Sequence, residues 1–129
     1  MARILIAEDE APLRAFVQRA LAEAGHDVVA AADGAEALDL IARAGGKFDL
    51  LLADIRMPVM DGIALALAAA RDYPDLTILL MTGYADQRER AHGLDALIHD
   101  VIAKPFSLAE IRAAVASALA RSGGVSGSR

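Results

Sequence analysis

Five side chains with the chemistry of a metal or phosphate site follow short apolar runs in this sequence. Glu8 and Asp9 follow the first run, Asp54 the third, Thr82 the fourth and Lys104 the fifth. If the runs are strands of one open parallel sheet, their carboxyl ends meet at the edge where such sheets bind ligands. Three carboxylates at one edge repel each other unless their pKa values rise or a hard cation binds between them. The pattern therefore indicates a Mg²⁺ site.

The remaining groups suit a phosphoryl ligand. Mg²⁺ keeps several waters and commonly bridges one or two carboxylates to phosphate oxygens. The Lys104 ammonium can follow one phosphoryl oxygen, and the Thr82 hydroxyl can donate to another. A carboxylate can itself be the nucleophile, and Asp54 is the candidate because it begins the loop after the middle run. Glu8 and Asp9 would then hold the metal.

Each of these residues also has a simpler interpretation when it is taken alone. An acidic residue after a strand often caps the next helix, and a single Lys or Thr usually lies on the solvated surface. Their convergence on one predicted sheet edge is what favours a site over these alternatives.

The elements that must position these residues alternate along the chain. Short apolar runs are separated by longer segments of helical period, which is typical of βα units around a parallel sheet. The runs are continuous rather than alternating, so helices should cover both sheet faces. We therefore predict an α/β, doubly wound, five-stranded parallel sheet with five helices. The predicted strands are Arg3 to Ala7, Asp27 to Ala31, Asp49 to Ala53, Leu76 to Met81 and Ile98 to Ala103.

The first helix has the clearest period and is expected to end at Gly25, with a stripe that we interpret as core rather than a docking surface. Capping boxes are expected at Asp33 with Glu36 and at Ser107 with Glu110. The third helix should span residues 62–71 and the fourth residues 86–94. The stripe of the first helix contains Leu13, Phe16, Val17, Ala20, Leu21 and Ala24.

Composition limits the possible functions. The 129 residues fit one domain, which we place at residues 1–121, followed by a flexible Gly/Ser-rich tail at 122–129. The net charge of −5, without a Lys/Arg stripe, argues against nucleic-acid binding. The chain has no cysteine, no apolar stretch long enough to span a membrane, and an acidic residue too early for a signal peptide. A cytoplasmic location is expected.

Four segments together resemble the receiver domain of two-component response regulators. The resemblance implies a flavodoxin-like sheet with strand order 2-1-3-4-5, and it implies that Asp54 accepts a phosphoryl group from a histidine kinase or histidine phosphotransferase. Mg²⁺ would be held by Asp9, Asp54 and the main-chain carbonyl of Arg56, with Glu8 holding a metal-bound water. Such domains catalyse only their own phosphorylation and dephosphorylation. The segments are Ile4 to Glu10, Asp49 to Gly62, Leu79 to Ala85 and Lys104 to Phe106.

The resemblance also implies a cis peptide bond between Lys104 and Pro105, with Pro105 structural. One position departs from the family pattern. Many receivers have an aromatic residue three positions before the lysine, and this chain has Val101 there. Tyr84, two residues after Thr82, is the candidate to replace that aromatic in coupling, and a packing role for Tyr84 is the alternative.

The motifs also resemble the stand-alone CpdR-type cell-cycle regulators of alphaproteobacteria, and this resemblance implies an adaptor role with the ClpX/ClpXP protease as partner. One alternative is a receiver-like adaptor that works without phosphorylation. A less favoured alternative is a small aspartyl-phosphate phosphatase of the haloacid dehalogenase type. That family places a second acid two residues after the nucleophile, where this chain has Arg56, and its cap domain would not fit.

Overall fold

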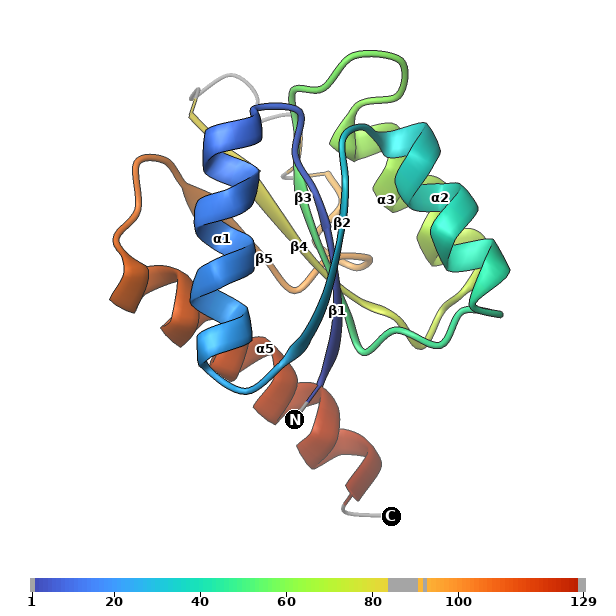
Figure 1. The fold of residues 1–129 in the computed structure, drawn as a ribbon. Helices are drawn as coiled ribbons and strands as arrows, with labels where there is room; N and C mark the ends of the chain where they lie inside the picture. The colour runs from blue at the N-terminus through green and yellow to red at the C-terminus, as the bar shows by residue number, and fades with distance from the viewer. Residues whose placement is uncertain (1, 84–90, 92, 128–129) are drawn as a thin grey trace.

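The computed structural model describes residues 2–83, 91 and 93–127, and their side chains as far as residue 120. Five parallel strands form one sheet in the order β2-β1-β3-β4-β5, which confirms the predicted order (Figure 1). In the described part of the chain, β1, β2, β3 and β5 are each followed by a helix, and each of these helices lies on one of the two faces of the sheet. The strands are β1 (Arg3–Ala7), β2 (Asp27–Ala31), β3 (Leu50–Asp54), β4 (Thr77–Thr82) and β5 (Asp100–Ala103).

The observed strands β1 and β2 match the predicted ranges, whereas β3 and β4 each begin and end one residue later. The cause is the parallel register, in which Asp54 is opposite Met81 and Thr82 is opposite Ala103. β5 begins at Asp100, two residues after the predicted start. Asp54 and Thr82 are therefore the last residues of their strands, and the ladder hydrogen bonds hold their backbones.

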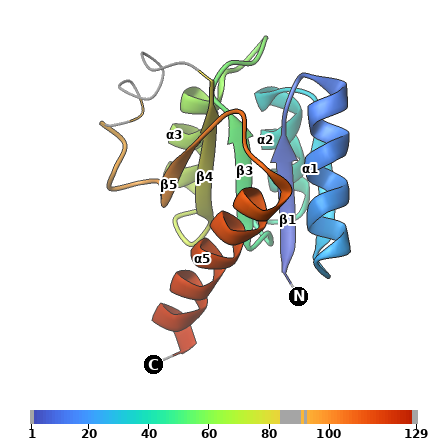
Figure 2. The same ribbon diagram turned by 90° about the vertical axis from the view of Figure 1, so that its left-hand side faces the viewer.

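Helices cover both faces of the sheet. α1 and α5 lie on one face, and α2 and α3 lie on the other, as Figures 1 and 2 show from two directions. α1 and α5 pack on sheet residues such as Ile4, Ile6 and Leu52, while α2 and α3 pack on Leu5 and Leu51. This alternation along β1 and β3 is the period of two expected for strands buried on both faces. The helices are α1 (Ala11–Glu23), α2 (Gly34–Arg43), α3 (Gly62–Asp72) and α5 (Leu108–Gly127).

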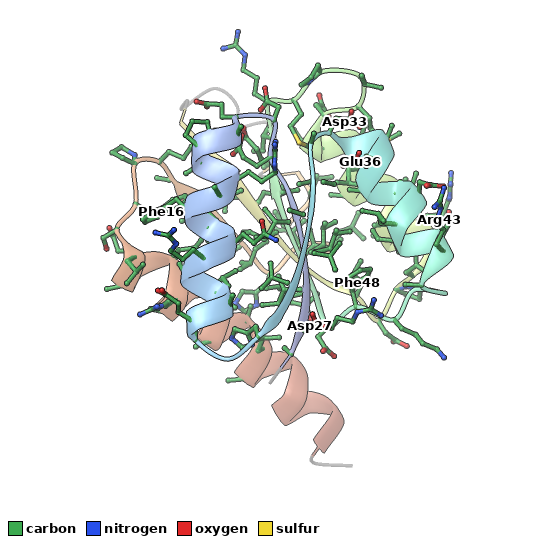
Figure 3. The ribbon with its side chains drawn as sticks, viewed as in Figure 1. Phe16, Asp27, Asp33, Glu36, Arg43 and Phe48 are labelled. Carbon is green, nitrogen blue, oxygen red and sulfur yellow. The ribbon has the colours of Figure 1, made fainter. Side chains whose placement is uncertain are left out.

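Side-chain caps fix where three of these helices begin. Asp33 accepts a hydrogen bond from the backbone N–H of Glu36 at 2.8 Å, and Asp61 caps α3 in the same way. Ser107 and Glu110 bond each other's backbone N–H groups, at 3.0 and 2.8 Å, so the predicted capping box of the last helix is confirmed. In Figure 3, Asp33 and Glu36 lie together at the start of α2.

Two helix predictions need correction. The described residues contain four helices rather than five, and the helix expected at residues 86–94 falls mostly on residues 84–90 and 92, outside the described part of the chain. The segment expected to be a tail from residue 122 is instead helical as far as Gly127, the end of α5. Extending a helix that is already packed through Ile111, Val115 and Ala118 costs far less than starting a new one. The last helix therefore continues past Gly123 and Gly124.

The stripe on α1 is only partly core. Val17, Ala20 and Leu21 are buried, but Phe16 is 40% exposed and Ala24 is exposed. The helical period correctly groups these residues on one face of α1, but the sheet covers only the middle of that face. Figure 3 places Phe16 on the opposite side of the sheet from α2. No helix in the described part of the chain combines the length and apolar character needed to cross a bilayer.

Candidate functional site

The polar residues predicted from the sequence lie at the carboxyl edge of the sheet. Ala7 and Ala53 are paired in the ladder, so the next residue of each strand, Glu8 or Asp54, stands at the same level of the edge. Thr82 ends β4, and its carbonyl accepts a hydrogen bond from the backbone N–H of Lys104 at 2.7 Å. Parallel pairing thus brings together residues that are far apart in the sequence.

Lys104 joins the two buried carboxylates of this edge. Its Nζ lies 3.0 Å from Oε1 of Glu8 and 3.0 Å from Oδ2 of Asp54. The Glu8 side chain is completely buried and the Asp54 side chain is 6% exposed, so water screens these contacts little. The predicted cluster of carboxylates and ammonium is therefore assembled, with a cation already placed between two of its acids.

Asp9 completes the group of acids and differs from them in exposure. One carboxylate oxygen from each of Glu8, Asp9 and Asp54 lies within 4.8 Å of the others. Asp9 is exposed, whereas the other two are buried. This set of hard oxygen donors suits Mg²⁺, which favours carboxylate and water ligands.

Burial dominates the electrostatics of the paired residues. It raises the pKa of Glu8 to about 7, and the Asp54 carboxylate adds to this rise while the Glu10 N–H and Lys104 oppose it. Burial also raises the pKa of Asp54, against hydrogen bonds from Lys104. Burial lowers the pKa of Lys104, but its hydrogen bonds to Asp54 and Glu8 outweigh this effect and leave the pKa above its usual value. A divalent cation at this edge would relieve the cost of keeping the two carboxylates charged.

An open cavity of about 890 Å³ adjoins the site. Its polar side contains Asp9, Asp54 and Lys104, so the Asp54 carboxylate faces a space that a ligand can enter. Its apolar side comes from α1 and from the segment after β5, and includes Pro12, Leu13, Phe16, Pro105 and Phe106.

The loop after β3 depends on Gly62. Its backbone N–H donates to the carbonyl of Ile55 at 2.8 Å, which brings the start of α3 back against the end of β3. A Cβ at this position would collide with the backbone carbonyl of Asp54. The sequence predicted that a helix begins at residue 62, and the close approach to the Asp54 backbone explains why that first residue is glycine.

The remaining sequence predictions have different outcomes. The Lys104–Pro105 peptide bond is cis, as predicted. Val101 is half-buried on β5 opposite Leu80, and its role in coupling stays a prediction. Tyr84 lies outside the described residues. Arg56 is exposed and lines the cavity, and its expected role in metal binding also stays a prediction.

Sequence reasoning missed two features of the site. It assigned Glu8 to the metal and did not anticipate the bond to Lys104, which is 96 residues away. It also assigned Phe16 to the core, although Phe16 and Leu13 line the cavity. The excess width of the apolar stripe on α1 was the available signal for the second feature.

The sequence is similar to those of known proteins. The sequence model of the response regulator receiver domain matches residues 4–116. Response regulator MprA from Mycobacterium sp. (strain KMS) is 38% identical over 119 residues, which are 92% of this chain and 51% of MprA. The chain thus spans about half the length of the curated relatives it matches.

Two solved structures have the same fold over nearly all of their length. Chemotaxis protein CheY4 from Vibrio cholerae is 30% identical with a TM-score of 0.82, covering 92% of this chain and 99% of CheY4. Response regulator TrrA from Thermotoga maritima, solved in complex with Mg²⁺ and BeF, is 29% identical with a TM-score of 0.81, covering 92% of this chain and 100% of TrrA. With the sheet order and the carboxylate cluster at the end of the strands, these matches establish that the chain belongs to the response regulator receiver domains of two-component signalling.

Proposed function

We propose that the protein accepts a phosphoryl group on Asp54 in a Mg²⁺-dependent reaction and that this modification switches a protein-binding surface. The observation that carries the proposal is the position of Asp54. Its carboxylate ends the central strand, lines the open cavity and lies 3.0 Å from the Lys104 ammonium. A carboxylate beside a fixed cation and a free volume can attack phosphorus while the charge of the incoming group is balanced.

The donor set fits the metal. Asp9 and Asp54 offer carboxylate oxygens at the cavity, and Arg56 is the candidate to add its main-chain carbonyl. Mg²⁺ bound there would neutralise charge on the phosphoryl oxygens and orient them. TrrA was solved in complex with Mg²⁺ and BeF, and this similarity supports Mg²⁺ as the metal for this chain.

The chain's own residues supply the rest of the reaction. A carboxylate oxygen of Asp54 bonds to phosphorus while the phosphorus–nitrogen bond of a phosphohistidine breaks, and the electron pair leaves with the imidazole nitrogen. Lys104 is within reach to pair with the oxygens of the transferred group, and Thr82 is placed at the neighbouring strand end to donate to another oxygen. The phosphodonor is a histidine kinase or a histidine phosphotransferase.

The switch follows from the added charge. By analogy with other phosphorylated side chains, the aspartyl phosphate carries close to two negative charges and additional acceptor oxygens. These draw Lys104 away from its present bonds and pull Thr82 toward the phosphoryl group. β4 ends at Thr82 and β5 leads directly into Lys104, so the change passes to Val101 and to the segment after Thr82 that contains Tyr84.

The output partner is proposed from the sequence resemblance. Similarity to the CpdR-type regulators makes the ClpXP protease a candidate partner, with this chain as a stand-alone adaptor. Co-sedimentation of purified ClpX with the unphosphorylated protein and with the beryllofluoride-treated protein tests this assignment. Equal lack of binding in both states would rule it out.

The phosphorylation itself is tested with acetyl phosphate and Mg²⁺. Intact mass should show one added phosphoryl group on the wild type and none on Asp54→Asn. If neither protein gains a group and beryllofluoride does not bind, the domain acts without phosphorylation. Steady release of phosphate from a phosphate ester would instead favour the phosphatase alternative.

A further inference from the structure

An arginine of α1 binds the backbone of the acidic segment, residues 8–10, which joins β1 to α1. The Nη1 atom of Arg14 lies 2.8 Å from the carbonyl oxygen of Glu8 and 3.5 Å from that of Asp9. The first contact is a charge-assisted hydrogen bond of ordinary length, and the second is weaker. The backbone N–H of Arg14 donates to the carbonyl of Glu10 at 2.9 Å. One half-buried residue therefore binds three successive carbonyls of the acidic segment.

The stability of α1 does not explain an arginine at this position. A cation near a helix N-terminus is disfavoured by the helix dipole, and α1 begins without an acidic residue in its first turn or a side-chain cap from Glu10. Pro12 lacks the N–H that could donate to the carbonyl of Glu8, four residues earlier. Helical side chains tilt toward the N-terminus, so the Arg14 guanidinium can reach back and supply the missing donor.

The contacts of Arg14 leave the carboxylates of the segment available to a metal. Within the described part of the chain, Arg14 bonds main-chain oxygens and forms no ion pair with a carboxylate. A guanidinium bound to a carboxylate would compete with the metal for its oxygens. Pro12 and Leu13 line the cavity, whereas Arg14 is not among the described residues of its wall. Arg14 is therefore placed to act on the site through the backbone.

The opposite side of the acidic segment is held by β2. The backbone N–H of Glu8 donates to the carbonyl of Ala31 at 3.1 Å, the last residue of β2. With Ala31 on one side and Arg14 on the other, the peptide planes that flank Asp9 are fixed, and they set the direction of its side chain. Asp9 is the exposed acid of the cluster, so the packed sheet does little to orient it.

We propose that Arg14 is a positioning residue for the metal site. By holding the carbonyls of Glu8 and Asp9, it keeps the carboxylates of the acidic segment directed toward Asp54 before an ion binds. Ligands that are already in place lose less conformational freedom when the ion arrives, so the ion binds more tightly. This inference rests on the proposed function and adds to it a residue that touches neither the metal nor the phosphoryl group.

Arg14→Met tests the proposal, because positioning and simple charge repulsion predict opposite changes in Mg²⁺ affinity. If Arg14 acted only through its charge, removing a cation near the acids would strengthen Mg²⁺ binding. If Arg14 positions the segment, the variant should bind Mg²⁺ about tenfold more weakly, as is typical when a group that orients metal ligands is lost. Isothermal titration calorimetry measures the affinity, and unchanged or tighter binding would overturn the inference.

Arg19→Met is the matched control. It removes the same charge from an exposed position of the same helix, five residues farther along the chain. We expect its Mg²⁺ affinity to stay within about twofold of the wild type, as for a change that does not couple to the metal. A loss in Arg19→Met equal to that in Arg14→Met would contradict a role specific to the acidic segment.

The second readout needs no metal. The ¹³C resonance of a carbonyl depends on the hydrogen bonds that the carbonyl accepts, so NMR of metal-free protein reports directly on the contact between Arg14 and Glu8. We expect the Glu8 carbonyl resonance to shift more than that of Asp9 in Arg14→Met and to stay in place in Arg19→Met. An unmoved Glu8 resonance in Arg14→Met would contradict the proposal.

Arg14→Lys provides a second variant if Arg14→Met is poorly folded. Lysine keeps the charge, but its side chain is one atom shorter and lacks the planar fork of donors. Mg²⁺ binding should therefore be weaker than in wild type although the net charge is unchanged, and wild-type affinity would count against positioning. Wild type that binds no Mg²⁺ would refute the proposed function, while the metal-free carbonyl resonances would still decide whether Arg14 holds the segment.

Discussion

Strands β3 and β5 both deliver a key group to the site, and they do so from opposite environments. β3 carries Asp54, is buried at every position and is paired on both sides, with β1 and with β4. β5 precedes Lys104, is exposed at both of its ends and stands last in the sheet order. The Asp54 carboxylate is thus fixed in the core, while the Lys104 ammonium that contacts it comes from the margin of the sheet.

This difference indicates how the site can switch without unfolding. Segments with few buried contacts and a free sheet edge open at lower free energy than a fully paired central strand. The proposed phosphorylation of Asp54 would therefore reposition Lys104 and β5 while β3 stays in place. The buried contact between Lys104 and Glu8 limits how far the cation can move in the unmodified state.

The largest effect should come from emptying space beside the central strand. Leu52 is a completely buried residue of β3 on the sheet face that α1 and α5 cover. Leu52→Ala should lower the free energy of unfolding by about 2–5 kcal/mol, because it removes apolar contacts and leaves a cavity. Urea unfolding measures this change. If Leu52→Ala lowered the free energy of unfolding less than Val101→Ala does, β3 would not be the more rigidly packed of the two strands.

The turn after β3 should be the next most sensitive feature. A methyl group on Gly62 collides with the Asp54 carbonyl, so Gly62→Ala must displace backbone beside the acceptor. We expect a loss of about 1–3 kcal/mol in stability together with slower phosphorylation by acetyl phosphate. Gly93→Ala is the control, since no atom lies within 4 Å of a Cβ there. Equal behaviour of the two variants would argue against a rigid acceptor loop.

The burial of Glu8 beside Lys104 should affect how the free energy of unfolding depends on pH. Folding raises the pKa of Glu8 from 4.5 to about 7, so the folded protein binds more protons than the unfolded chain in that interval. The stability of metal-free protein should therefore fall as the pH rises from about 4.5 to about 7. Lys104 opposes this rise, so Lys104→Met should steepen the fall. A flat profile in urea unfolding between these pH values would contradict the electrostatic assignment.

A smaller gain in stability is expected in the acceptor loop. Val59 has φ of 68° and is 83% exposed, and a β-branched residue is strained in this left-handed conformation. Val59→Asn should raise the free energy of unfolding by about 1 kcal/mol, since asparagine tolerates that conformation. Thermal unfolding detects the change, and phosphorylation of Asp54 should be preserved.

The smallest effect should be at the margin of the sheet. Val101 is half-buried on β5, and Val101→Ala should cost less than about 1.5 kcal/mol, at the low end of core truncations. Its effect on the switch should exceed its effect on stability. NMR shifts on addition of beryllofluoride should reach fewer residues beyond β4 in this variant than in wild type. If the shifts reached the same residues in Val101→Ala as in wild type, Val101 would have no role in the coupling.

Much of the fold follows from local patterns in the sequence. Continuous apolar runs identify buried strands, and Ser107 with Glu110 marks the start of α5, because both signals depend on residues close in the chain. The register was less accessible, and β3 and β4 each end one residue later than their apolar character suggests. Strand ends depend on which neighbour offers the next hydrogen bond, and that information lies in another part of the chain.

The sequence by itself determined which residues gather at the carboxyl edge, because parallel strands end together and Asp9, Asp54 and Thr82 each follow or end a strand. Only the tertiary structure decided how these groups contact one another. The contact from Lys104 to Glu8, the complete burial of Glu8 and the position of Phe16 at the cavity depend on side-chain reach and on helix placement. These are distances between segments far apart in the chain, and local sequence patterns carry no record of them.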